Sequence, residues 1–511
     1  MRLLHRRDLL QLGAGAAVAM ACAGSGEVLG AGRGDELDAL LDGTMAPLLA
    51  ALRRGRVELP DIAERVAARI EAGQALNAVV SFDRGVLLAD AKRLAGERRR
   101  LHDAPLFGLP VALKDNIDAV PFATTAGTPA LRSHHPMRDA DVVQRLRAAG
   151  ALIVCKTNMD ELAAWGTTNN GVFGRTANPY AIERHTGGSS GGSAVAVAAR
   201  MVPVALGTDT AGSIRNPASF CGVVGFRPTH DRVPARGVVP LARRRDSVGP
   251  FARSVADIVS LDAVLTADRG RVALAALRGL RLGVPRLPFQ RDLAPAVAAV
   301  FERTLETLGA AGVVLVPGEI PGLEAAVEQA AVVTIGGAVR EDLQQYLADS
   351  GATVSVDDVF AQIWNPAVRS WLGEFFRPSA ETSVAFDRAW NQTVAGLRQQ
   401  VRGYFAAQDV SAILFPTTPI VAGIEVPGTG DLILDGVRVR NGVWRNIQNN
   451  TPASVWDGPA ISLPAGLSVD GLPVGLELDG PIDADRRLLG VALAVESRLP
   501  EPFRIGSVDA G

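Results

Sequence analysis

Three short segments carry residues that could together attack an acyl group. Lys114 ends an apolar run, Ser189 lies in the Gly/Ser-rich turn 187–193, and Ser213 closes the loop 207–213. A lysine buried among apolar side chains loses proton affinity because desolvation disfavours its charge, so it can act as a base near neutral pH. A glycine-rich turn lets several backbone N–H groups point at one spot, as an oxyanion hole requires. A serine linked to such a base is an activated nucleophile.

Each of these segments is weak evidence alone, because a Gly-Ser loop is usually a flexible turn and a lone lysine is usually a solvated surface group. The elements around them alternate between strand and helix. We expect strand 107–113, helix 141–149, strand 151–155, helix 190–200, strand 202–206, loop 208–213, helix 254–265, strand 280–284, helix 293–308, strand 313–316, strands 460–463 and 474–478, and helix 485–499. This alternation predicts an α/β fold with a mixed, largely parallel central β-sheet covered by helices on both faces.

The rest of the chain is expected to support this core within one domain over residues 32–505, because no linker or internal repeat interrupts it. Long helices are expected at 323–347 and 386–407, and a β-hairpin at 432–439. The expected parts of the domain are a helical lead-in (32–101), a catalytic core (102–318), a variable helical cap (319–450) and a C-terminal return to the core (451–505).

Composition and charge narrow the class of protein. The chain has 511 residues, of which 48% are hydrophobic and 21% charged, so a large core is expected and disorder is not. The formal net charge is −2 and no basic tract occurs, so we expect a small-molecule partner and no nucleic acid. No His-Glu-x-x-His, Cys-x-x-Cys, dinucleotide or Walker motif occurs, so neither metal nor cofactor is expected. The histidines lie in polar loops or at the N-terminus, which disfavours a Ser-His-Asp hydrolase.

The N-terminus, residues 1–31, has the pattern of an export signal. The adjacent pair Arg6 and Arg7 precedes a weakly apolar, Ala/Gly-rich run, which is typical of a twin-arginine signal peptide. We therefore expect a periplasmic or secreted protein. Cys22 leaves lipidation as a minor alternative, and no other stretch of the sequence is long and apolar enough to span a bilayer.

Taken together and in order, the motifs resemble the amidase signature family from about residue 35 to residue 500. The resemblance is carried by segments spread along the chain. They are Gly108–Asn116, Lys156–Glu161, Asn178-Pro179, Gly187–Ala199, Gly207–Thr229, Asp246–Asp257, Phe415–Pro419, Pro459–Gly466 and Gly471–Gly475. The resemblance implies hydrolysis of a carboxamide C–N bond through an acyl-enzyme.

The family uses a Ser-Ser-Lys triad, which the resemblance carries onto three matching positions. Lys114 would be the base, Ser189 the bridging serine after a cis peptide bond, and Ser213 the nucleophile. The resemblance also implies an oxyanion hole built from the backbone N–H groups of Thr210, Ala211, Gly212 and Ser213. The chain departs from the common pattern at Ala211, where the family often has glycine. A methyl group there could trim the acyl site but removes no donor.

Residues that flank the triad have more than one interpretation. Asp209 and Arg215 could contact substrate, but an ion pair that braces the nucleophile loop is the favoured interpretation. The family's pockets are built by variable segments, which here makes Met159, Trp165, Phe173 and Trp456 candidate substrate-binding residues, with Trp364 and Trp371 as further wall candidates. For at least half of these aromatic residues, core packing is the more common role.

Two other functions remain to be weighed against an exported amidase that works as a monomer or homodimer. An inactive, binding-only homologue would have lost a triad residue, and all three are present. The glutaminase subunit of a tRNA amidotransferase shares the family motifs, but it needs cytosolic partners, and the expected export signal argues against that.

Overall fold

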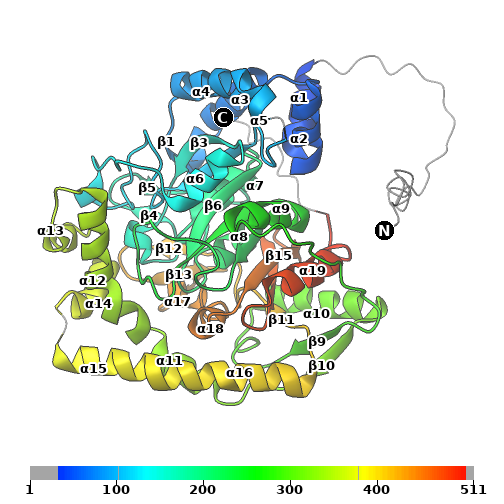
Figure 1. Ribbon diagram of the computed structural model, residues 1–511. Helices are drawn as coiled ribbons and strands as arrows, with labels where there is room; N and C mark the ends of the chain where they lie inside the picture. Colours follow the sequence, from blue (N-terminus) through cyan, green and yellow to red (C-terminus); the bar gives the residue numbers. More distant parts are fainter. Residues whose placement is uncertain (1–32, 102, 378, 502–511) are drawn as a thin grey trace, which may run out of the picture. The chain divides into compact units, whose positions relative to one another are not determined.

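The computed structural model describes residues 33–101, 103–377 and 379–501. Within them, a central sheet of eleven strands organises the fold (Figure 1). The expected export signal and Cys22 lie outside the described residues. In spatial order the strands are β1 (Val79–Ser81), β3 (Leu152–Thr157), β2 (Pro110–Lys114), β6 (Val204–Asp209), β8 (Ser247–Ala252), β7 (Val224–Arg227), β15 (Ala460–Leu467), β16 (Pro473–Asp479), β11 (Ala412–Pro416), β9 (Arg281–Val284) and β10 (Val314–Pro317).

The mixed sheet is confirmed, but the expectation that it is largely parallel is wrong. Strand pairs β2–β3, β2–β6, β9–β10 and β9–β11 are parallel. The other six neighbouring pairs, β1–β3, β6–β8, β7–β8, β7–β15, β15–β16 and β11–β16, are antiparallel. The strand–helix alternation missed β7 and β8, which pair antiparallel in the middle of the sheet. Glycine and proline within Ser247–Ala252 weaken the sequence signal for a strand.

Most of the elements expected around the candidate triad are present. They are β2, α6 (Asp141–Ala148), β3, α7 (Gly191–Ala198), β6, α9 (Val255–Leu265), β9, α10 (Pro295–Ala310), β10, β15, β16 and α19 (Asp485–Glu496). Strand β6 runs three residues further than expected, so Thr208 and Asp209 belong to the strand and the nucleophile loop begins at Thr210. The short helix α8 (Arg215–Cys221) follows that loop.

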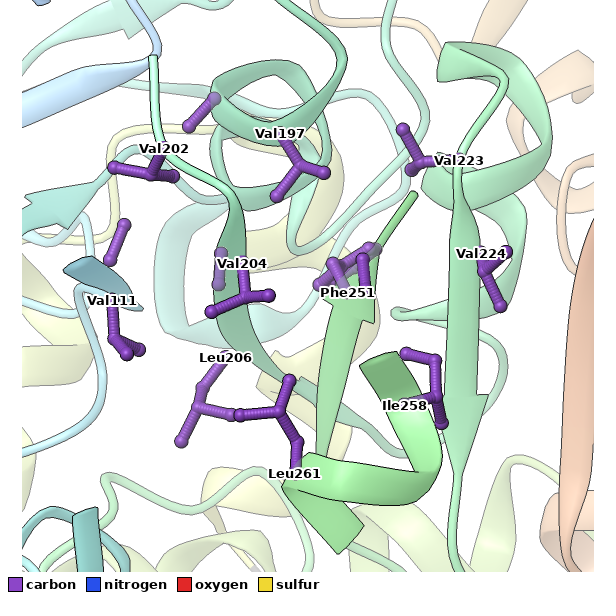
Figure 2. Close-up of a cluster of buried hydrophobic side chains, with 14 of the residues drawn as sticks. Val111, Val197, Val202, Val204, Leu206, Val223, Val224, Phe251, Ile258 and Leu261 are labelled. Carbon is purple, nitrogen blue, oxygen red and sulfur yellow. The ribbon is translucent and has the colours of Figure 1, made fainter. Parts of the chain in front are cut away.

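Helices of small and branched residues pack directly on the strands that carry the triad. Figure 2 shows Val197 of α7 and Ile258 and Leu261 of α9 in one buried cluster with side chains of β2, β6, β7 and β8. The start of α7 approaches β3 closely, because a Cβ added at Gly192 would lie 2.5 Å from the backbone N and O of Asn158. Only glycine allows this approach, which fixes where the Ser189 turn enters α7.

Helices before the core supply a second apolar layer. They are α1 (Arg33–Asp42), α2 (Met45–Arg54), α3 (Leu59–Ala72), α4 (Arg84–Gly96) and α5 (Arg98–Leu101). Ile62, Val66 and Ile70 of α3 follow the spacing expected for one helical face, and all three are buried. Each such side chain contributes roughly 1.5–3 kcal/mol by leaving water.

The range expected for the cap is mainly helical but differs from the expectation in detail. Its helices are α11 (Leu323–Ala330), α12 (Val333–Ser350), α13 (Val356–Ala361), α14 (Pro366–Phe376), α15 (Ala380–Arg388), the π-helical turn η4 (Ala389–Val394) and α16 (Ala395–Gln408). The single helix expected at 323–347 is thus two helices, α11 and α12. The range 319–450 also supplies β11 to the central sheet, between β16 and β9.

Short elements complete the region near the site. They are the two-stranded sheet β4 (Asn169–Asn170) and β5 (Gly174–Arg175), the three-stranded sheet β12 (Ile424–Val426), β13 (Asp431–Leu434) and β14 (Val437–Val439), and helices α17 (Gly442–Arg445) and α18 (Thr451–Trp456). The expected hairpin is confirmed: Asp435 and Gly436 take the positive φ values of 49° and 78° between β13 and β14. Among the described residues, no helix is both long and apolar enough to cross a membrane.

Candidate active site

Lys114 lies at the end of β2 with no exposed surface. Its Nζ atom is 2.7 Å from Ser189 Oγ and 2.8 Å from Thr208 Oγ1. Burial lowers the pKa of Lys114 to about 7, and the more distant carboxylates of Asp160, Asp246 and Asp209 oppose that shift only in part. Lys114 can therefore exchange a proton near neutral pH, as the sequence predicted.

Ser189 is held in place by a fixed turn just before α7. The Gly188–Ser189 peptide bond is cis, as the family resemblance implied. Asn216 clamps Gly188, since its Oδ1 accepts from the Gly188 N–H at 2.9 Å and its Nδ2 donates to the Gly188 carbonyl at 2.7 Å. The Ser189 carbonyl accepts from the Asp160 N–H at 3.1 Å. These bonds hold the hydroxyl of Ser189 against Lys114.

Ser213 lies at the wall of a pocket, whereas Lys114 and Ser189 are buried behind it. The pocket is lined by Ser213 together with Thr210 and Ala211 of the same loop. The Ser190 N–H donates to the Ser213 carbonyl at 3.2 Å, which ties the nucleophile loop to the Ser189 turn. The fold thus brings the three triad candidates together, although they are 75 and 24 residues apart in the chain.

The nucleophile loop differs from the expected oxyanion hole at one position. The Gly212 N–H donates to Asp209 Oδ1 at 2.8 Å, so this donor already has a carboxylate partner. Gly212 has a φ of 118°, which favours glycine and turns this peptide toward Asp209. The expectation that Gly212 faces an oxyanion is therefore contradicted, and Thr210, Ala211 and Ser213 remain as the expected donors.

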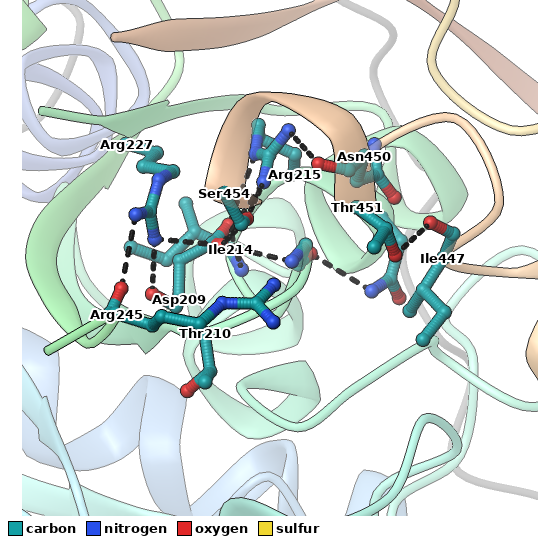
Figure 3. A network of polar contacts seen from close by, with 12 residues as sticks. Asp209, Thr210, Ile214, Arg215, Arg227, Arg245, Ile447, Asn450, Thr451 and Ser454 are labelled. Atoms are coloured by element: carbon teal, nitrogen blue, oxygen red, sulfur yellow. Dashed lines mark hydrogen bonds and ion pairs between the residues drawn. The ribbon is translucent and has the colours of Figure 1, made fainter. Parts of the chain in front are cut away.

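Asp209 and Arg215 form the ion pair expected to brace this loop (Figure 3). Arg215 Nε lies 3.1 Å from Asp209 Oδ2 and Nη2 lies 3.0 Å from Oδ1, a bidentate arrangement between two fully buried side chains. Burial alone would raise the pKa of Asp209, but Arg215 and Arg227 outweigh it and hold that pKa well below its usual range. Asp209 also accepts from the Ile214 N–H at 3.1 Å, so its carboxylate fixes both sides of Ser213.

The same arginine connects the nucleophile loop to the segment 447–456. Arg215 Nη1 donates to the Asn450 carbonyl at 2.8 Å and lies 2.6 Å from Glu477 Oε1, while Nη2 donates to Ser454 Oγ at 2.8 Å. Figure 3 shows Asn450 and Ser454 facing Arg215 from a separate stretch of chain. Because Ile447 in this segment lines the pocket, the brace also positions part of the pocket wall.

A second buried lysine lies next to the site in a different setting. Lys156 lies near the end of β3 and has no exposed surface. Its partner on the neighbouring strand β2 is Leu113, the residue before Lys114. Its Nζ is 3.3 Å from Asp115 Oδ1, and it also donates to the Ala123 carbonyl at 3.0 Å. Burial lowers the pKa of Lys156, and the Asp115 carboxylate opposes that shift. Lys156 thus has a carboxylate partner as well as the Thr124 hydroxyl at 3.1 Å, whereas the side-chain partners of Lys114 are hydroxyl groups.

The pocket beside Ser213 is apolar and rich in tryptophan, with an empty volume of about 540 Å³. Trp165 and Trp371 line it, as the sequence suggested, together with Trp444, which was not among the candidates. Ring centroids of Trp165 and Trp444 are 5.9 Å apart and those of Trp371 and Trp444 are 6.4 Å apart, both edge-to-face. Trp371 Nε1 donates to the Ala164 carbonyl at 3.1 Å, which fixes its ring.

The other candidate wall residues lie outside the set that lines this pocket. Met159 is buried in the cluster beneath it, and Trp456 is packed in a core cluster with Phe289 and Phe415. Phe173 lies in the turn before β5, where its carbonyl accepts from Asn77. Trp364 is 48% exposed. The structure thus shows core packing, which is the more common role, for Met159 and Trp456.

Other titratable groups in the described ranges are buried or scattered. No cluster of three or more His, Cys, Asp or Glu side chains that could hold a metal ion exists in the described part of the chain. Cys155 and Cys221 are buried and unpaired, and burial raises the pKa of the Cys155 thiol to about 12. His185 is fully buried, accepts from the Gly187 N–H, and has its pKa lowered to about 3 by burial.

Comparison with known proteins agrees with this geometry. Residues 61–489 match the model of the family described as Amidase. The indoleacetamide hydrolase of Agrobacterium vitis is 37% identical over 456 residues, covering 89% of this chain and 97% of the relative. The mandelamide hydrolase of Pseudomonas putida is 37% identical over 487 residues, covering 91% and 93%.

A solved structure extends the likeness to three dimensions. The native peptide amidase of Stenotrophomonas maltophilia superimposes with a TM-score of 0.79 at 30% identity, covering 91% of this chain and 99% of the other. The family match spans most of the chain, and both relatives exceed 30% identity over nearly their whole length. The chain therefore belongs to the amidase signature family and is a hydrolase acting on carbon–nitrogen bonds.

Proposed function

We propose that this enzyme hydrolyses small amides with an aromatic acyl group, using Ser213 as nucleophile and Ser189 and Lys114 as its proton relay. The observation that carries the proposal is the buried Lys114–Ser189 contact at 2.7 Å directly behind a pocket lined by Ser213 and three tryptophans. A base with a pKa of about 7 and a pocket for an apolar ring are the two parts that such a reaction needs.

The proposed reaction has two stages. Neutral Lys114 accepts a proton from Ser189, which accepts the Ser213 proton as Ser213 Oγ bonds to the amide carbon. The proton returns along the relay to the amide nitrogen, the C–N bond breaks, and ammonia or an amine leaves. Water then attacks the Ser213 ester by the same relay, which releases the carboxylic acid and restores the serine. Loop N–H groups of Thr210, Ala211 and Ser213 stabilise both oxyanions.

The acyl group is assigned from the pocket walls. Trp165, Trp371 and Trp444 line the pocket and contact one another edge-to-face, and the rest of the lining is aliphatic or small, which suits an aromatic acyl group. No charged side chain lines this pocket among the described residues, so a charged acyl group would be desolvated without a partner. The names of the two relatives, indoleacetamide hydrolase and mandelamide hydrolase, also describe amides with an aromatic acyl group.

The test is a panel of primary amides with purified enzyme. The enzyme should release ammonia from phenylacetamide, mandelamide and indole-3-acetamide with a kcat/KM at least tenfold above that for acetamide or glutamine. Burial of an aromatic ring contributes a free energy of about this size. The matched variants are Ser213→Ala in the loop and Ser190→Ala in the neighbouring turn. Equal ammonia release by wild type and Ser213→Ala would disprove the nucleophile, and a preference for glutamine would disprove the acyl group and favour the amidotransferase-subunit alternative.

We also propose that the protein is exported through the twin-arginine route and acts there as a monomer or homodimer. Arg6 and Arg7 ahead of the Ala/Gly-rich run support the route. Fractionation of a bacterial host with this export system should place the shortened wild-type protein outside the cytoplasm and the Arg6→Lys, Arg7→Lys double variant inside it. Equal distribution of the two would disprove export. Light scattering of the purified protein should give the mass of one or two chains.

A further inference from the structure

An open groove adjoins the tryptophan-lined pocket at the nucleophile loop. Ala211, Val332, Ile335, Trp444 and Ile447 line both the pocket and the groove, so the two spaces share one wall. The groove differs in chemistry, because Arg291, Glu324, Glu328, Arg445 and Gln448 also line it. A substrate bound at Ser213 thus has an apolar space on one side and a charged space on the other.

The two spaces suit the two halves of an amide. The acyl half stays bonded to Ser213 after the C–N bond breaks, whereas the amine half must leave and water must enter. The pocket that Ser213 itself lines has mainly buried walls, and the groove is bordered by exposed residues such as Glu328. The groove is therefore the side on which an amine with a substituent fits.

The charges of the groove indicate which substituent it takes. Arg291 and Glu324 neutralise each other at 2.6 Å. Arg445 is half-buried, and its one hydrogen bond among the described residues runs from Nη2 to the Asp292 carbonyl. None of the carboxylates in the described chain pairs with it. Glu328 is exposed, so water and salt screen its charge more than they screen that of Arg445.

We propose that this groove is a leaving-group subsite in which Arg445 binds a carboxylate, so that the enzyme also hydrolyses N-acyl amino acids with an aromatic acyl group. In that reaction water is consumed, the C–N bond breaks, and an aryl-substituted carboxylate and a free amino acid are released. This inference rests on the proposed function, because it uses the same Ser213 and the same acyl pocket. It adds a substrate class whose amine half carries a negative charge.

The test compares amides that share one acyl group and one product, phenylacetate. N-Phenylacetylglycine carries the carboxylate, N-(2-hydroxyethyl)phenylacetamide is its neutral counterpart, and phenylacetamide has no substituent. Phenylacetate release should give a kcat/KM for the glycine conjugate about tenfold above that of the hydroxyethyl amide, the factor expected for one charge-assisted hydrogen bond. In Arg445→Gln this ratio should fall to about one, and Arg445→Lys should retain part of it. Because both amides are measured on the same sample, the ratio is independent of how much enzyme is folded.

The control removes the same charge elsewhere. Arg303 is exposed on α10 and does not line the groove, so Arg303→Gln should keep the wild-type ratio. A wild-type ratio of one or less, or an Arg445→Gln ratio equal to wild type, would overturn the subsite. Hydrolysis of phenylacetamide without hydrolysis of either substituted amide would overturn the subsite and leave the proposed function standing. No phenylacetate from any of the three would overturn both.

Discussion

The two buried lysines lie on adjacent strands and are equally buried, yet their surroundings suit them to different tasks. Lys114 on β2 and Lys156 on β3 both have no exposed surface, and burial lowers the pKa of each. Lys156 lies 3.3 Å from the Asp115 carboxylate, whereas the contacts of Lys114 at hydrogen-bond distance are the hydroxyls of Ser189 and Thr208. A nearby carboxylate keeps a buried lysine charged and fixed, while hydroxyl partners let it give up its proton. Burial is common to both lysines, so the absence of a close carboxylate partner is what favours Lys114 over Lys156 as the proposed base.

The largest expected effect comes from removing the base. Lys114→Met keeps the size of the side chain and should lower kcat on phenylacetamide by about 10⁴–10⁶-fold, the range for loss of one triad residue in other serine hydrolases. The melting temperature should stay level or rise, because a desolvated amine is replaced by an apolar chain. A melting temperature that falls together with the activity would mean that Lys114 is a structural residue like Lys156.

The matching change at the second lysine should reverse the pattern. Lys156→Met leaves the Asp115 carboxylate buried without its cation, and should lower the free energy of unfolding by about 3–5 kcal/mol in denaturant titrations. The kcat of the folded enzyme should change by less than tenfold. The double variant Lys156→Met, Asp115→Asn should recover part of the stability. A 10⁴-fold loss of kcat in a stable Lys156→Met enzyme would give that lysine a direct catalytic role.

Giving Lys114 a carboxylate should make it resemble Lys156. In wild type, kcat/KM should rise with pH through an apparent pKa near 7, because only neutral Lys114 accepts a proton and its neutral fraction grows above that pKa. Thr208→Asp places an acid where the hydroxyl now contacts Nζ, and should move this rise upward by about 1–3 pH units. The pH profile of kcat/KM measures the shift, with Thr208→Asn as the neutral control. An unmoved profile would exclude Lys114 as the titrating base.

The smallest expected effect comes from removing the hydroxyl partner. Thr208→Val deletes an oxygen that accepts from the Lys114 amine at 2.8 Å and so favours its charged form. The apparent pKa in the same profile should therefore fall, by less than about one unit, which is the scale of one neutral hydrogen bond. A rise in that pKa would show that Thr208 stabilises the neutral amine instead.

How much the sequence could predict depends on how local each feature is. Ser189, Ser213 and Lys114 lie in segments that are weak evidence singly, and it was their order together with the matching motifs around them that predicted their roles. The Asp209–Arg215 pair lies within a single turn of chain and was also predictable. The Gly212 N–H was assigned to the oxyanion because sequence shows a donor but not the direction in which it points.

The pocket wall could be predicted only in part, because it forms where distant segments meet. Its three tryptophans come from a loop (Trp165), α14 (Trp371) and α17 (Trp444). No local sequence pattern distinguishes Trp444 in this wall from Trp456, which is packed in the core. The antiparallel strand β8 was missed because its glycine and proline resemble loop residues. Its pairing with β6 on one side and β7 on the other shows that this segment is extended.

The separate origins of the three tryptophans have a consequence for how this enzyme can change. Each ring is carried by an element that holds no residue of the proposed triad, so we expect exchange of a ring to leave the Lys114–Ser189 contact in place. A library should randomise positions 165, 371 and 444 together, because the Trp444 ring contacts both of the others. We expect the loop around Ser213 to be less tolerant, since Asp209 at the end of β6 accepts from its N–H groups and Arg215 ties it to α18.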